Sequence, residues 1–175
     1  MLPSNPVLVS ATRSDLLETR FRGSVSIVGR SGKELFSLGD TEAFVYPRSA
    51  LKYFQVLPLL LSGAADAYGF SDAEIAVMCA SHNGEPEHLA QVAAIFQKAG
   101  LESEDLRCGA HRPLGEAAAD YLIRNGQAWD SMHNNCSGKH AGFLALAKFL
   151  GADLKTYLHL DHPVQQQIRK VVAEM

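Results

Sequence analysis

The stretch Tyr46-Pro47-Arg48-Ser49-Ala50-Leu51-Lys52 decides how this chain folds, because strand-like sequence gives way there to helical sequence. Pro47 suits a first helical position, since its fixed φ is already helical and its missing N–H has no helical partner to lose. Ser49 and Lys52 stand three positions apart, a spacing that places both side chains on one face of a helix. We therefore expect a helix that begins with a hydroxyl and an amine side by side.

Such a pair can form an activated nucleophile without a histidine. Free backbone N–H groups and the positive end of the helix dipole stabilise a developing oxyanion near Ser49. Burial and that same positive end disfavour an ammonium group, so we expect Lys52 to accept the serine proton. The same spacing also occurs by chance in helices whose lysine is simply solvated, so the motif needs support from the rest of the chain.

Residues before this stretch alternate as strands do, and residues after it carry helix signals. Antiparallel strands are expected at Val7–Arg13, Leu16–Phe21, Gly23–Gly29 and Glu34–Gly39. Helices are expected from Pro47 to about Ser62, after the capping box Ser71-Asp72-Ala73-Glu74, and over Pro86–Gly100, Leu114–Asn125, Gly138–Leu150 and Asp161–Met175. This order predicts an α+β fold in a single domain, 1–175, with antiparallel strands in 1–45 and mainly helices in 46–175.

Composition and charge exclude several classes of protein. The 175 residues are 47% hydrophobic and 20% charged, which is typical of a folded domain and not of a disordered chain. A formal net charge of −3 indicates neither a nucleic-acid footprint nor a membrane-surface patch. The longest apolar stretch, Val56–Ala65, contains Pro58 and is too short to span a bilayer. Three cysteines and the lack of a secretory signal pattern favour a cytoplasmic location.

A second polar cluster is the loop Ala80-Ser81-His82-Asn83-Gly84-Glu85-Pro86. A serine, a histidine and an amide on one loop can relay protons and clamp a substrate. The alternative is that Ser81 or Asn83 only satisfies backbone groups at a turn.

The third cluster is Met132-His133-Asn134-Asn135-Cys136-Ser137-Gly138-Lys139-His140. A thiolate is favoured at a helix N-terminus, and Cys136 has ligand-type spacing to neighbouring histidines and to Lys139. A metal site needs three or four ligands, so a structural cysteine remains the alternative. The other cysteines and histidines are interpreted as structural, surface or capping residues: Cys79, Cys108, His88, His111, His159 and His162.

Taken in order, the three motifs resemble the thermolabile, Rhizobium-type L-asparaginase II family, also called class 3 asparaginases, with similarity from Val7 to the end of the chain. The resemblance implies a fold similar to serine β-lactamases and glutaminases, with an antiparallel sheet packed by helices. It implies hydrolysis of L-asparagine to L-aspartate and ammonia. As partners we expect a small-molecule amide substrate and a second copy of the chain in a homodimer, and neither nucleic acid nor a membrane.

Carried over residue by residue, the resemblance implies that Ser49 and Lys52 are a first catalytic pair and that Ser81 belongs to a second serine–lysine pair. It implies that Cys136 and Lys139 bind zinc, which would position the substrate. The residues that line or support the pocket would be Arg48, His82, Asn83 and His140. We expect Ser49 to attack the side-chain amide after Lys52 takes its proton, while Ser81 relays protons.

In family members the lysine partner of Ser81 and a second zinc-binding cysteine lie farther along than Met175. The last helix also lacks a stop signal, so we expect the chain to be an N-terminal portion of the catalytic domain. Three alternatives stay open: a penicillin-recognising serine hydrolase, which also uses Ser-x-x-Lys, a glutaminase, and an inactive metal-binding fragment. Asparagine and glutamine differ by one methylene, worth only about 1–3 kcal/mol of discrimination.

Overall fold

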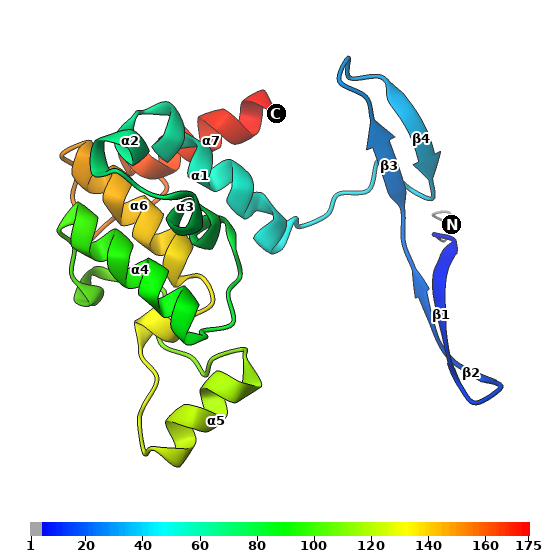
Figure 1. Cartoon of the computed structure of the whole chain (residues 1–175). Coiled ribbons are helices and arrows are strands. Elements are labelled where there is room, and N and C mark those ends of the chain that lie inside the picture. Colours follow the sequence, from blue (N-terminus) through cyan, green and yellow to red (C-terminus); the bar gives the residue numbers. More distant parts are fainter. Residues whose placement is uncertain (1–4) are drawn as a thin grey trace. The chain divides into compact units, whose positions relative to one another are not determined.

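The computed structural model describes residues 5–175. The chain divides into two compact units, Met1–Tyr46 and Pro47–Met175, each of which is described by itself (Figure 1). The boundary falls inside the stretch where strand-like sequence changes to helical sequence.

The first unit consists of two antiparallel β-hairpins (Figure 1). Their strands are β1, Val7–Arg13, paired with β2, Leu16–Arg22, and β3, Val25–Val28, paired with β4, Glu34–Leu38. The second hairpin turns at Gly32, whose φ of 78° is in the left-handed region that glycine adopts without a steric penalty. The strand segments predicted from alternation are therefore present, and they form two two-stranded sheets.

The second unit is helical. Its α-helices are α1, Lys52–Leu61; α2, Ala64–Tyr68; α3, Asp72–Cys79; α4, Pro86–Ala99; α5, Glu116–Arg124; α6, Ser137–Phe149; and α7, Pro163–Glu174. Three short 3₁₀ helices are η1, Arg48–Leu51; η2, Ser103–Asp105; and η3, Ser131–His133. Strands followed by helices confirm the α+β prediction. The finer prediction of a sheet packed by helices, as in serine β-lactamases, stays a prediction.

Helix α6 is the centre of the helical unit, and α1, α3, α4 and α7 pack against it. Ten of its residues are buried, because small and apolar side chains occur all round the helix and not along one stripe. The closest approach is at Gly138, where an added Cβ would lie 2.3 Å from the carbonyl oxygen of Val77 in α3. Glycine at this position lets the start of α6 lie directly against the end of α3.

Helix ends follow local signals in the sequence. Ser71 and Glu74 form a capping box at the start of α3, since the Ser71 N–H donates to Glu74 Oε2 at 2.6 Å and the Glu74 N–H donates to Ser71 Oγ at 3.3 Å. Pro163 occupies the first turn of α7, and Gly100 ends α4 with a φ of 62°. None of the helices within residues 5–175 combines the length and the apolar composition that crossing a membrane requires.

Candidate functional site

Three segments that are distant in sequence meet beside the start of α6. The first is the loop Ala80–Glu85, the second is the segment 108–115 before α5, and the third is the segment 130–136 before α6. Backbone hydrogen bonds join them: the His82 N–H donates to Asn135 O at 3.2 Å, and the Gly115 N–H donates to Asn83 O at 2.8 Å. The second and third sequence motifs are therefore neighbours in the structure.

Lys52, the first residue of α1, reaches into this junction. Its side chain is buried, with 2% of the residue exposed. The Nζ atom lies 2.6 Å from Ala80 O, 2.8 Å from Ser81 Oγ and 3.5 Å from Asn135 O. The lysine of the first motif thus touches the loops of the second and third.

The partners of Lys52 Nζ differ in whether they can exchange a proton with it. Carbonyl oxygens only accept hydrogen bonds, so N–H groups of Lys52 point to Ala80 and Asn135. The remaining direction of the nitrogen faces Ser81 Oγ, a hydroxyl that can accept or donate. When the amine is neutral, its lone pair faces the Ser81 hydroxyl and can take the serine proton. Ser81 itself is exposed, so its hydroxyl is accessible to a substrate.

Ser49 lies in η1, one helical turn before Lys52, and is exposed. The side-chain hydrogen bonds of Lys52 go to Ala80, Ser81 and Asn135, and within residues 5–175 none joins Lys52 to Ser49. The expected Ser49–Lys52 hydrogen bond is therefore not formed. The role of Ser49 as nucleophile stays a prediction. The neighbouring Arg48 is also exposed and adopts a φ of 48°, an uncommon backbone conformation for a residue other than glycine.

His82 is buried and both its ring nitrogens are engaged. Nδ1 accepts the Gly84 N–H at 3.1 Å, so Nε2 carries the proton and donates to Ser137 Oγ at 2.8 Å. The Ser137 hydroxyl in turn donates to Met132 O at 2.8 Å. Burial, together with the charges of His88 and Lys52, lowers the pKa of His82 to about 4, so the ring is neutral near pH 7. The contacts of His82 hold the Ser81 loop on α6.

His140, on the first turns of α6, is also buried. The Tyr157 hydroxyl accepts the Arg107 N–H at 2.9 Å and donates to His140 Nδ1 at 2.7 Å. Burial lowers the pKa of His140 to about 3 and raises the pKa of Tyr157 to about 12, so both groups are neutral. In contrast, Asn83 is exposed and its carbonyl accepts the Gly115 N–H. Of the four predicted pocket residues, Arg48 and Asn83 face solvent, whereas His82 and His140 are internal.

Cys136 and Lys139 lie at the start of α6 and are half-buried. Burial lowers the pKa of the Lys139 amine, an effect that the nearby Cys136 thiol opposes. A neutral amine and a thiolate are suitable zinc ligands, but within residues 5–175 no group of three histidine, cysteine, aspartate or glutamate side chains could hold a metal ion. Two donors fall short of the three or four protein ligands that zinc takes, so these residues alone do not form a zinc site.

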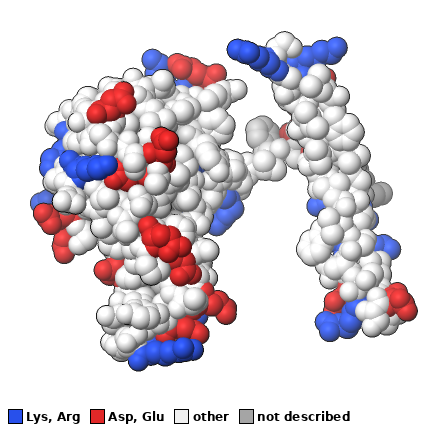
Figure 2. All heavy atoms as spheres, in the orientation of Figure 1, with Lys and Arg blue, Asp and Glu red and all other residues white. Residues whose placement is uncertain are grey.

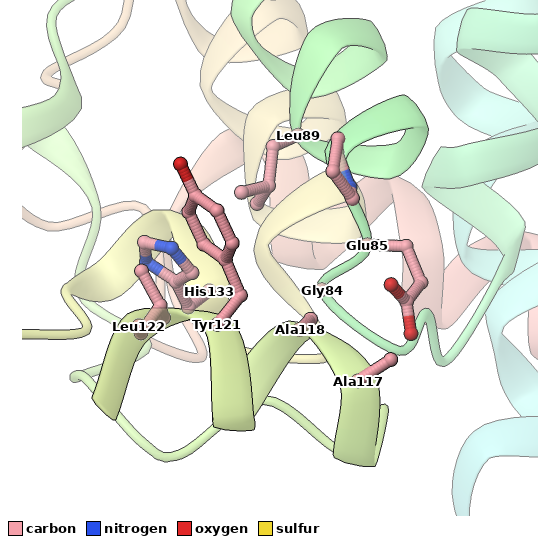
Figure 3. A pocket seen from close by; sticks show the side chains of 9 residues that line it. Gly84, Glu85, Leu89, Ala117, Ala118, Tyr121, Leu122 and His133 are labelled. Atoms are coloured by element: carbon pink, nitrogen blue, oxygen red, sulfur yellow. The ribbon is translucent and has the colours of Figure 1, made fainter. Parts of the chain in front are cut away.

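A mostly apolar cavity of about 270 Å³ is lined in part by Gly84 and Glu85, at the end of the loop that contains Ser81 (Figure 3). Helix α5 contributes Ala118, Tyr121 and Leu122, which lie opposite Leu89 of α4. Neither Ser81 nor Lys52 lines this cavity. It therefore adjoins the catalytic candidates without containing them.

Two residues at the junction, Asn135 and His111, are not among the site residues expected from the sequence. Asn135 supplies a carbonyl near Lys52 and accepts the His82 N–H, as described above. His111, interpreted from the sequence as a surface or capping residue, is half-buried, and its Nε2 accepts the Asn135 N–H at 3.0 Å. No local pattern indicates this contact, because the partner of His111 is 24 positions away.

In a comparison with family models, the model of the L-asparaginase II family matches residues 9–175. A comparison with curated proteins gives no match.

Proposed function

The chain belongs to the L-asparaginase II family, and we propose that its serine and lysine side chains carry out the reaction of that family, the hydrolysis of L-asparagine to L-aspartate and ammonia. The family match confirms the resemblance on which the sequence-based expectation depended. It covers all three motifs, and it makes the chain an amidohydrolase of the L-asparaginase type. The catalytic roles of individual side chains are the proposal.

One observation supports the proposal above all others: the buried Lys52 amine lies 2.8 Å from the exposed Ser81 hydroxyl. A general base must lie within hydrogen-bond reach of the proton that it takes. Lys52 meets this condition for Ser81. It is also one helical turn from Ser49, whose hydroxyl is free of hydrogen bonds to residues 5–175 and faces solvent.

We assign the steps as follows. The Ser49 oxygen attacks the side-chain carbonyl carbon of asparagine as its proton passes, through Ser81, to the Lys52 nitrogen. The carbon–nitrogen bond of the amide breaks, the proton returns to the leaving nitrogen, and ammonia departs. Water then attacks the resulting ester and gives its proton to the same lysine, which releases aspartate and restores the Ser49 hydroxyl. The amide is cleaved in two easier steps instead of one.

Ammonia release by single-residue variants tests these roles. Ser49→Ala and Lys52→Met are expected to lose activity almost completely, whereas Ser81→Ala should lose about 10²–10⁴-fold, the usual contribution of a proton-transfer group. Ser103→Ala, a change of an exposed serine in η2, serves as the control and should keep full activity. Near-normal turnover by Ser49→Ala would exclude Ser49 and make Ser81 the nucleophile.

We also propose that the chain binds zinc, without a catalytic role for the metal. Cys136 and Lys139 would supply two of the donors to a bound zinc ion, and no catalytic step is assigned to the metal. Zinc per chain, measured in the wild type, in Cys136→Ser and in the matched control Cys79→Ser, tests this claim. We expect Cys136→Ser alone to lose zinc, and equal zinc in all three proteins would contradict the assignment.

The other expectations from the sequence remain predictions. The family match favours asparaginase over a penicillin-recognising hydrolase, and turnover of glutamine beside asparagine tests the glutaminase alternative. Asparagine turnover by this 175-residue chain would contradict the alternative of an inactive fragment, and a lack of turnover would favour it. Acidic side chains are spread over the face of the helical unit shown in Figure 2, with basic side chains mainly toward its edges. The homodimer and the cytoplasmic location stay predictions.

A further inference from the structure

His111 has two hydrogen-bonding contacts of opposite kind. Its Nδ1 lies 2.7 Å from Arg112 O, which only accepts, so Nδ1 carries the ring proton. Its Nε2 accepts the Asn135 N–H at 3.0 Å, so this nitrogen presents its lone pair. The atom of the Asn135 side-chain amide that lies 3.1 Å from the same nitrogen is Oδ1, which also only accepts, so it forms no hydrogen bond with Nε2 in this tautomer. One neutral tautomer satisfies both backbone contacts.

Asn135 connects this ring to the catalytic candidates. Its carbonyl oxygen accepts the His82 N–H at 3.2 Å, which fixes the residue that follows Ser81. The same oxygen lies 3.5 Å from Lys52 Nζ, where it forms one side of the three-oxygen surroundings of the amine. A shift of Asn135 would therefore change the direction of the Lys52 amine relative to the Ser81 hydroxyl.

We propose that His111 is a positioning residue for this reaction: through its Nε2 it fixes the Asn135 backbone, and Asn135 fixes Lys52 Nζ against Ser81. The catalytic part of this proposal rests on the proposed function. Its structural part, the dependence of the Lys52 environment on the Nε2 contact, can be measured without any turnover.

Two amide substitutions separate the contacts of the ring. In His111→Asn the side-chain amide can reach Arg112 O, as Nδ1 does, but it is too short to reach the Asn135 N–H. In His111→Gln the longer amide reaches the Asn135 N–H with its oxygen, as Nε2 does. If His111 only fills space or only holds Arg112, His111→Gln should be no closer to the wild type than His111→Asn.

Kinetics of asparagine hydrolysis give the first readout. We expect His111→Asn to lower kcat by about 10- to 100-fold with little change in KM, because the chemical step depends on the lysine geometry. His111→Gln should keep kcat within about threefold of the wild type. His159→Asn and His159→Gln change an exposed histidine and control for the loss of an imidazole. Equal kcat values in the two His111 variants would overturn the proposal.

The second readout is the NMR chemical shift of Lys52 Cε in ¹³C-lysine-labelled protein, assigned by its absence in Lys52→Met. We expect the shift to move in His111→Asn and to stay at the wild-type position in His111→Gln. An unmoved signal in His111→Asn refutes the positioning role, whatever the activity. If wild-type protein lacks asparagine turnover but the signal moves as expected, the proposed function fails while the positioning role stands.

Discussion

The contact between α3 and α6 at Gly138 leads to a prediction that connects packing with catalysis. In Gly138→Ala the new Cβ would lie 2.3 Å from Val77 O and 2.8 Å from the Val77 carbonyl carbon. Both are backbone atoms, so no side chain can rotate away. The helices must separate by roughly 1 Å before the contact reaches an ordinary van der Waals distance.

The expected cost follows from two opposing effects. Gly138 is the second residue of α6, so alanine there gains at most part of the about 0.5–1 kcal/mol by which it exceeds glycine in a helix interior. Overpacking a well-packed core costs about 1–3 kcal/mol, and a backbone clash belongs at the upper end of that range. We therefore expect Gly138→Ala to lower the free energy of unfolding by about 2 kcal/mol, or the Tm by about 4–8 °C for a chain of this size.

Activity should fall as well, because α3 leads directly into Ala80 and Ser81, two of the groups around Lys52 Nζ. A displacement of about 1 Å at a catalytic group costs about 10²-fold in rate. Urea unfolding followed by circular dichroism measures the stability, and ammonia release measures the activity at a temperature where the variant is folded.

Gly142→Ala is the matched control on the same helix. There the added Cβ meets Met78 Sδ at 3.1 Å, the flexible end of a side chain that can move. Its stability should lie within about 0.5 kcal/mol of the wild type, since the gain in helix propensity offsets the small repacking cost. A Gly138→Ala protein that is as stable and active as Gly142→Ala would refute the reasoning about close approach.

Two further predictions concern stability. Because the folded-state pKa values of His82 (about 4) and His140 (about 3) are lower than in the unfolded chain, the stability from their neutral rings is complete above about pH 6.5 and is lost as pH falls toward those values. Urea unfolding at about pH 7.5 and pH 5 should show this loss, and His82→Gln should reduce it. Glu74 accepts hydrogen bonds from the Ser71 N–H and from Lys98 Nζ at 2.7 Å. Glu74→Ala should therefore cost about 2 kcal/mol in thermal unfolding, and Glu74→Gln, which keeps the cap, about half of that.

The elements that sequence predicts well are those whose ends depend on local chemistry. The Ser71 capping box, Pro86 and Pro163 at helix starts and Gly100 at a helix end all act through backbone groups within a few residues. Their effect does not depend on the rest of the fold, so the predicted boundaries agree with the observed helices.

The partner of Lys52 could not be predicted in the same way. Helical spacing relates it only to near neighbours such as Ser49, whereas its contacts are 28 to 83 positions away. These contacts form because α3 and α6 meet at Gly138 and bring their adjoining loops together. For the same reason His111 escaped notice, since its importance depends on a loop 24 positions later.

The surroundings of Lys52 bear on how a proton could move through this site. Buried amines are usually paired with a carboxylate, yet within residues 5–175 no carboxylate oxygen lies within 4.0 Å of Lys52 Nζ. Its partners are two carbonyl oxygens and one hydroxyl, all of them neutral. A change in the charge of the amine therefore breaks no ion pair and leaves no buried anion without a partner. Ser81 is the one partner that can itself give or take a proton, which makes the exposed hydroxyl the natural path between the amine and a substrate.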